Sequence, residues 1–227
     1  MLCCTGTLIK KFDLTTYQFT DIYDFSSGTV YWVVTNSDAT IAYILYKNAS
    51  NVYFIKKFDM SDPAGTISDQ SHNISFSTNS FGMDITADDN YLVVCDYSGN
   101  KTYKVQISDG TTTTIGNQNA TYCFVTKDGL YAYVASNWDT GSYKLHKLPL
   151  DGTNQNNPVH TFDGVWVSVS MSPSGARMGL SHLRGGDPRI EIYDMQVSGT
   201  DLHDATLEGT SGGGNTEEEV VASEGPT

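Results

Sequence analysis

The chain has few of the residues that build helices or bind nucleic acid. It has 227 residues, and Glu191 is the only glutamate before Glu208. It carries 13 Lys and Arg against 26 Asp and Glu, a formal charge of −13. A chain so poor in clustered cations is a weak partner for phosphate backbones or anionic membranes. We therefore expect no nucleic acid partner.

Long apolar segments are also missing. No hydrophobic run approaches the roughly 20 residues that a membrane-spanning helix needs. The first residues, Met1–Thr7, lack the apolar stretch of a secretory signal peptide. The sequence therefore predicts no membrane span, and it leaves an intracellular location open.

The abundant residues are β-branched and aromatic, and they include 14 Tyr, 9 Phe and 3 Trp. Such residues favour strands, and no window keeps a helical period of apolar positions. The sequence therefore predicts an all-β fold. It argues against all-α and α/β folds and the catalytic motifs that those folds carry.

Two short patterns recur at intervals of about 40 to 50 residues, a period typical of propeller repeats. The first is a strand that ends in Ser or Thr before a turn, at Thr35, Thr86, Thr126 and Ser172. The second is a Gly-Thr pair after an alternating strand, beginning at Gly65, Gly110, Gly152 and Gly199. Each repeat divides into four short strands. This pattern predicts the four-stranded antiparallel blades of a β-propeller.

Two stretches carry a resemblance to known repeats. Tyr131–Asn137, followed by the strand Tyr143–Leu148 and the turn Asp151–Thr153, resembles a YVTN-type propeller repeat. Ser172-Pro-Ser-Gly175 is similar to the hairpin of WD40-like and TolB-like blades. True WD40 features are missing, because the one Trp-Asp pair, Trp138-Asp139, is expected in a loop. The resemblance implies a propeller fold and leaves the function open.

The predicted organisation is a propeller of about five blades over residues 1–209. Residues 1–25 supply part of a composite blade, and the complete blades span about 30–76, 81–116, 121–164 and 166–209. The outermost strand of the first complete blade is expected at 67–76, and that of the last at 205–207. Residues 210–227 form an acidic Gly/Glu-rich tail, in which 219–223 could close the composite blade. The alternative is a fragment of a six- to eight-bladed propeller.

The sequence assigns no catalytic, cofactor or metal site. The cysteines Cys3, Cys4, Cys95 and Cys123 fit no zinc pattern. A Cys95–Cys123 bridge requires that two strand ends in neighbouring blades approach; otherwise the cysteines act as small buried hydrophobes. Oxygen-rich turns at 88–90 and 96–100 leave calcium as an alternative to plain solvated turns.

Four Asn-X-Ser/Thr sequons are candidate N-glycosylation sites, although chance alone predicts a similar number. They begin at Asn48, Asn73, Asn100 and Asn119. Asn48, Asn100 and Asn119 fall in predicted loops, so we expect all three to be exposed.

These features predict a non-enzymatic binding or structural module. Its partners would be proteins or further copies of the chain, contacted through propeller faces or edge strands. The Tyr/Thr/Ser/Asn-rich composition favours an extracellular or cell-surface glycoprotein. One alternative is a propeller hydrolase or lactonase with a metal in the central channel, for which Asp84 is the one acid expected on an innermost strand. The other alternative is an intracellular scaffold.

Overall fold

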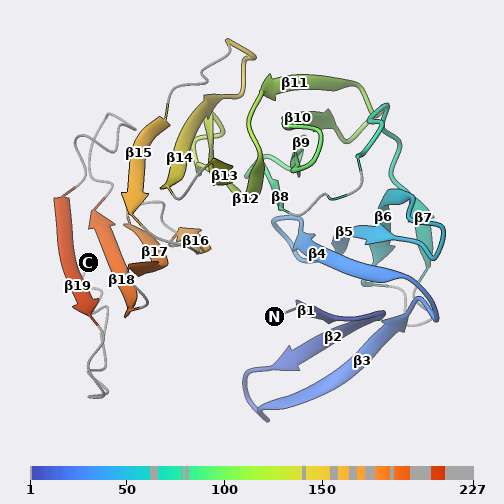
Figure 1. Cartoon of the computed structure of the whole chain (residues 1–227). Helices are drawn as coiled ribbons and strands as arrows, with labels where there is room; N and C mark the ends of the chain where they lie inside the picture. The colour runs from blue at the N-terminus through green and yellow to red at the C-terminus, as the bar shows by residue number, and fades with distance from the viewer. Residues whose placement is uncertain are drawn as a thin grey trace.

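The fold is built from antiparallel strands alone. The computed structural model describes residues 2–61, 66–77, 79, 82–139, 142–153, 158–163, 168–171, 177–184, 187–194 and 206–212. Every regular element in these ranges is a strand, and the strands form five antiparallel sheets. Figure 1 shows the sheets following one another in an arc, each with its first strand toward the inside.

Sheet 1 contains β1 (Leu2–Thr5), β2 (Leu8–Asp13) and β3 (Gln18–Asp24). Sheet 2 contains β4 (Thr29–Thr35), β5 (Ile41–Lys47), β6 (Tyr53–Asp59) and β7 (Ile67–Asp69). Sheet 3 contains β8 (Met83–Ile85), β9 (Tyr91–Asp96), β10 (Lys101–Gln106) and β11 (Thr112–Gly116). Sheet 4 contains β12 (Ala120–Val125), β13 (Tyr131–Asp139), β14 (Ser142–Pro149) and β15 (Pro158–Asp163). Sheet 5 contains β16 (Ser168–Met171), β17 (Arg177–Arg184), β18 (Asp187–Asp194) and β19 (Thr206–Gly212).

The predicted all-β fold of four-stranded blades is confirmed, but three strand ends differ from the expectation. Strand β7 stops at Asp69, and the Gln70 amide forms one more backbone hydrogen bond, to the Ile55 carbonyl of β6, while the Gln70 side chain donates to the carbonyl of Ile107 in sheet 3. Trp138 and Asp139 lie in β13 instead of a loop, since Asp139 pairs with Ser142. Strand β19 pairs with β18 as far as Gly212, beyond the predicted start of the tail.

Within the described residues, sheet 1 has three strands and the other four sheets have four each. Strand β1 lies at one edge of it, and the carbonyl of Gly6, just after β1, accepts a hydrogen bond from the Val30 amide of sheet 2. The predicted closing strand at 219–223 lies outside the described residues. No helix capable of crossing a bilayer is found within the described ranges.

The apolar core consists of layers between neighbouring sheets. Alternate residues of a strand face opposite sides, so β5 contributes Ala42 and Ile44 to one layer and Tyr43 and Leu45 to the next. A third layer, between sheets 3 and 4, contains Val93, Cys95, Ala132 and Leu148, among others. Each sheet with two neighbours is therefore buried on both faces.

A half-buried carboxylate joins sheets 3 and 4. Asp84 on β8 accepts hydrogen bonds from the backbone amide of Val125 on β12 at 2.6 Å and from the Ile85 amide at 2.9 Å. Burial raises the pKa of Asp84 to about 6, although both hydrogen bonds oppose this change. The folded state therefore binds a proton more tightly than the unfolded chain does.

This pKa predicts how stability depends on pH. A raised folded-state pKa gives stability that is present at pH 4 and is lost as the pH rises through about 6. Relative to Asp84→Asn, the wild-type free energy of unfolding should fall by about 2 kcal/mol between pH 4 and pH 7. Urea denaturation of both proteins across this range measures the difference.

Asp38→Asn is the matched control. Hydrogen bonds from Thr40 lower the pKa of the exposed Asp38, so its contribution has the opposite sign and is lost as the pH falls. Parallel pH curves for wild type and Asp84→Asn would contradict the account of Asp84.

Candidate functional site: an open groove between sheets 3 and 4

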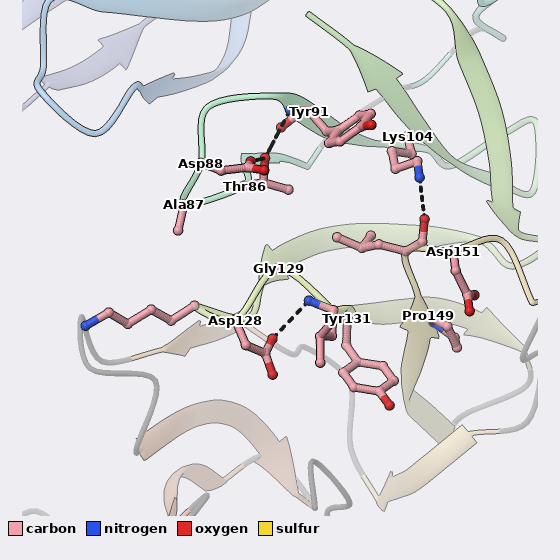
Figure 2. Close-up of a pocket in the computed structure, with 13 residues that line it drawn as sticks. Thr86, Ala87, Asp88, Tyr91, Lys104, Asp128, Gly129, Tyr131, Pro149 and Asp151 are labelled. Atoms are coloured by element: carbon pink, nitrogen blue, oxygen red, sulfur yellow. Dashed lines mark hydrogen bonds between the residues drawn. The ribbon is translucent and has the colours of Figure 1, made fainter. Parts of the chain in front are cut away.

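A groove of about 570 Å³ opens between sheets 3 and 4. Its walls are the hairpin between β8 and β9, the hairpin between β12 and β13, and the chain just after β14 (Figure 2). The lining residues are Thr86, Ala87, Asp88, Tyr91, Lys104, Lys127, Asp128, Gly129, Leu130, Tyr131, Pro149, Leu150 and Asp151.

The hairpins that join the first two strands of sheets 2, 3 and 4 share one geometry. In sheet 3 the amide of Thr86 donates to the Tyr91 carbonyl, and the amide of Asp89 donates to Thr86. The corresponding bonds occur in sheet 2 from Asn36 and in sheet 4 from Thr126. The residue three positions after each of these has a positive φ: 56° at Ala39, 59° at Asp89 and 69° at Gly129. The three hairpins can therefore be compared position by position.

Sheets 2 and 3 are joined at their hairpin tips by a contact that we call the hairpin clamp. The Asp89 carboxylate accepts a hydrogen bond from the Ser37 amide at 2.9 Å and another from the Ser37 hydroxyl at 2.6 Å. Hydrogen bonds to a carboxylate are among the stronger ones in proteins. The clamp therefore holds the two tips together at this end of the interface.

Both partners of the clamp are replaced at the next interface. The residue of sheet 4 that corresponds to Asp89 is Gly129, and the residue of sheet 3 that corresponds to Ser37 is Ala87. Neither has a side chain that could form the clamp. A Cβ added at Gly129 would meet no atom within 4 Å. Both small residues line the groove (Figure 2).

Deeper in the interface, sheets 3 and 4 are tied together. The Lys104 ammonium donates to the carbonyl of Leu150 and lies 4.7 Å from the centre of the Tyr91 ring. Between sheets 2 and 3, the Gln70 amide donates to the corresponding carbonyl, that of Ile107, at 2.7 Å. Both interfaces are thus closed at this depth, and they differ at the hairpin tips.

The charges in the groove are fixed by local hydrogen bonds. Asp88 accepts from the hydroxyl of Thr86, Asp128 from that of Thr126, and Asp151 from the Thr153 amide. These bonds hold the pKa values of Asp88 and Asp151 below the ordinary aspartate range, so both are ionised at neutral pH. The carboxylates therefore bind their own turns instead of one another.

Apolar surface accompanies these charges. Leu130 is 59% exposed at the hairpin tip, and the Tyr131 ring has the Lys147 ammonium 4.1 Å from its centre. Rigid aromatic and aliphatic surface beside fixed polar groups is typical of protein-binding sites. The sequence could not reveal the groove, because its walls come from hairpins about 40 residues apart whose alignment requires the fold.

The disulfide allowed by the sequence is not present. Cys95 and Cys123 are both buried free thiols in the layer between sheets 3 and 4. The Cys123 thiol donates to the carbonyl of Val93 at 3.5 Å, and burial raises its pKa well above the ordinary value. Cys4 is likewise not part of a disulfide. These three cysteines therefore act as small packing residues, and the Cys3 side chain lies outside the described part.

The four sequon asparagines differ in exposure. Asn73 and Asn100 are exposed, but Asn48 and Asn119 are half-buried, so the expected exposure holds for Asn100 alone among the three loop residues. The side-chain oxygen of Asn48 accepts from the amides of Ser50 and Val52, which draws that side chain onto its own turn. Glycosylation of all four stays a prediction.

The oxygen-rich turns are occupied by hydrogen bonds. Asp96 is 1% exposed, and its carboxylate accepts from the Ser77 hydroxyl and amide. The Gly99 amide, in the turn at 97–100, also donates to this carboxylate, so hydrogen bonds from within the protein occupy its oxygens. In the described ranges, no three His, Cys, Asp or Glu side chains lie together in a way that could hold a metal ion.

One side-chain pair was missed from the sequence. The Ser136 hydroxyl lies 3.0 Å from Nε2 of His146, which pairs β13 with β14. Ser136 also donates to the carbonyl of Lys144 at 3.2 Å, so its single proton has a backbone acceptor. His146 is 4% exposed. This buried pair suits a structural contact between strands.

Comparisons with solved structures identify the fold. A chain in the structure of a nidogen/laminin complex matches with a TM-score of 0.69 and 7% identity, over 92% of this chain and 91% of that one. A putative TolB from Agrobacterium tumefaciens matches with a TM-score of 0.74 and 15% identity, over 92% and 76%. TolB from Acinetobacter baumannii matches with a TM-score of 0.65 and 16% identity, over 82% of this chain and 46% of that one.

No protein-family model matches the sequence. No curated protein matches it either. At these identities the structural matches establish the fold and nothing finer. They agree with the five sheets and with the resemblance carried by the repeats. The chain is a β-propeller repeat protein whose fold is similar to that of TolB.

Proposed function

We propose that this chain is a non-enzymatic protein-binding module and that the groove between sheets 3 and 4 is its contact surface. The observation that carries this proposal is the missing hairpin clamp. Two neighbouring interfaces share one backbone design, and one of them lacks both clamp partners, Asp89 being replaced by Gly129 and Ser37 by Ala87.

The chemistry of the groove supports a peptide ligand. Extended peptides need apolar contacts for their side chains and polar contacts for their backbone, and the groove offers both through Leu130, Tyr131 and the surrounding charged groups. One of the matching structures is itself a complex between proteins, that of nidogen and laminin. Propellers of this fold can therefore serve as interaction modules.

A closed variant tests the proposal. In Ala87→Ser/Gly129→Asp, the new Asp occupies a position where Asp89 already adopts the same positive φ, and the new Ser corresponds to Ser37. We expect this variant to form a second clamp across the groove. Peptides selected from a random display library on the wild-type chain should bind the closed variant at least tenfold more weakly, measured by fluorescence anisotropy.

Gly6→Asp is the matched control, because Gly6 also has a positive φ of 60° and free space around it, but lies in sheet 1. It should bind the selected peptides as the wild type does. If selection enriches no peptide, or if the peptides bind the closed variant as tightly, the groove is not the contact surface.

We further propose that the module acts outside the cell, in extracellular or surface assemblies. The exposure of Asn73 and Asn100 supports this placement, because both sequons are accessible to glycans. The native chain should have a mass above 24.8 kDa that falls after enzymatic deglycosylation. Intact-mass spectrometry of native material measures this. A mass unchanged by deglycosylation would favour an intracellular scaffold instead.

A further inference from the structure

We propose that the ligand of the groove is an acidic peptide segment whose carboxylate binds the backbone amide of Ala87. The inference rests on the proposed function and names the chemistry of its partner. Its basis is the neighbouring interface, where a carboxylate already occupies the corresponding position.

The hairpin clamp shows what this position binds. Between sheets 2 and 3, the Asp89 carboxylate reaches the first residue of the sheet 2 turn and accepts from the amide and hydroxyl of Ser37. The clamp is therefore an internal example of a carboxylate bound at a hairpin tip. A ligand carboxylate in the groove would accept the backbone amide hydrogen bond of such a clamp, without the hydroxyl bond.

The backbone amide of Ala87 is a hydrogen-bond donor that is available to a ligand. Ala87 is exposed and lines the groove opposite Gly129 (Figure 2). Among the described residues, no acceptor is found for its N–H, whereas the Ser37 amide has Asp89. With only hydrogen atoms on Gly129, the space that the Asp89 side chain fills at the other interface is free for a ligand.

The charged groups around the Ala87 amide are compatible with a bound carboxylate. Asp88, next to Ala87, accepts a hydrogen bond within its own hairpin. Asp38, next to Ser37, does the same with Thr40. The Asp38 carboxylate does not prevent that of Asp89 from binding the Ser37 amide. Lys104 and Lys127 also line the groove and add positive charge to it. The competing expectation is a basic segment, attracted by Asp128, Asp151 and the net charge of −13.

Two substitutions at Ala87 act in opposite directions. Ala87→Pro removes the N–H alone, at the second position of a turn, where proline is favoured. In the sequence repeat, Pro173 follows the anchor Ser172 just as Ala87 follows the anchor Thr86. Ala87→Ser keeps the N–H and adds the hydroxyl that Ser37 uses to bind Asp89.

The experiment uses peptides selected on the wild-type chain that lose binding to the closed variant. Each Asp and Glu of a peptide is replaced by Asn or Gln, and affinities are measured by fluorescence anisotropy. We expect one acid whose replacement weakens binding by about tenfold to a hundredfold, the range of a charge-assisted hydrogen bond. Ala87→Pro should cause a similar loss, and the two losses should not add. Ala87→Ser should tighten binding.

Thermal unfolding shows whether Ala87→Pro is still folded, and the Ala87→Ser result stands independently of it. Groove-binding peptides without an essential acid, or enriched in Lys and Arg, would overturn the inference and leave the proposed function intact. Equal binding to wild type, Ala87→Pro and Ala87→Ser would overturn it as well. If no selected peptide distinguishes the wild type from the closed variant, the proposed function itself fails.

Discussion

Hydrogen bonds between the hairpins of neighbouring sheets determine where this molecule is closed and where it is open. The apolar layers hold the sheets together along their length, but apolar contacts have no direction and do not fix the hairpin tips. The Asp89–Ser37 clamp does so between sheets 2 and 3. Where Gly129 and Ala87 replace its partners, the same design leaves a groove with a free backbone donor.

At the interface between sheets 3 and 4, polar contacts below the hairpin tips hold the sheets together, and the tips themselves stay open for a ligand. Asp84 and Lys104 tie the sheets together through backbone groups of the opposite sheet, Val125 and Leu150. These bonds preserve the spacing of the sheets without a clamp at the tips. The groove can therefore be open without loosening the layers beneath it, and a ligand would find its walls already in place.

Much of the fold could be predicted from the sequence, because repeats, turn residues and β-branched runs are local signals. The strand pairing of the repeats and the short sheet 1 both follow from them. The strand ends could not be predicted: β7 ends at Asp69, well before the expected residue 76, and the side chain that follows contacts the Ile107 carbonyl of the next sheet. The groove could not be predicted from the sequence either. The groove is recognised because Gly129 and Ala87 stand where the other interface has Asp89 and Ser37. This comparison requires hairpins aligned by their structure.

Amide hydrogen exchange at the hairpin tips, followed by NMR, tests the central claim most directly. The account predicts that the Ser37 amide, bound to Asp89, is protected, while the Ala87 amide exchanges at close to the rate of an unstructured peptide. In Ala87→Ser/Gly129→Asp the amide at position 87 should become protected as well. Protection of the Ala87 amide in the wild type would show that the groove is already closed and would contradict the account.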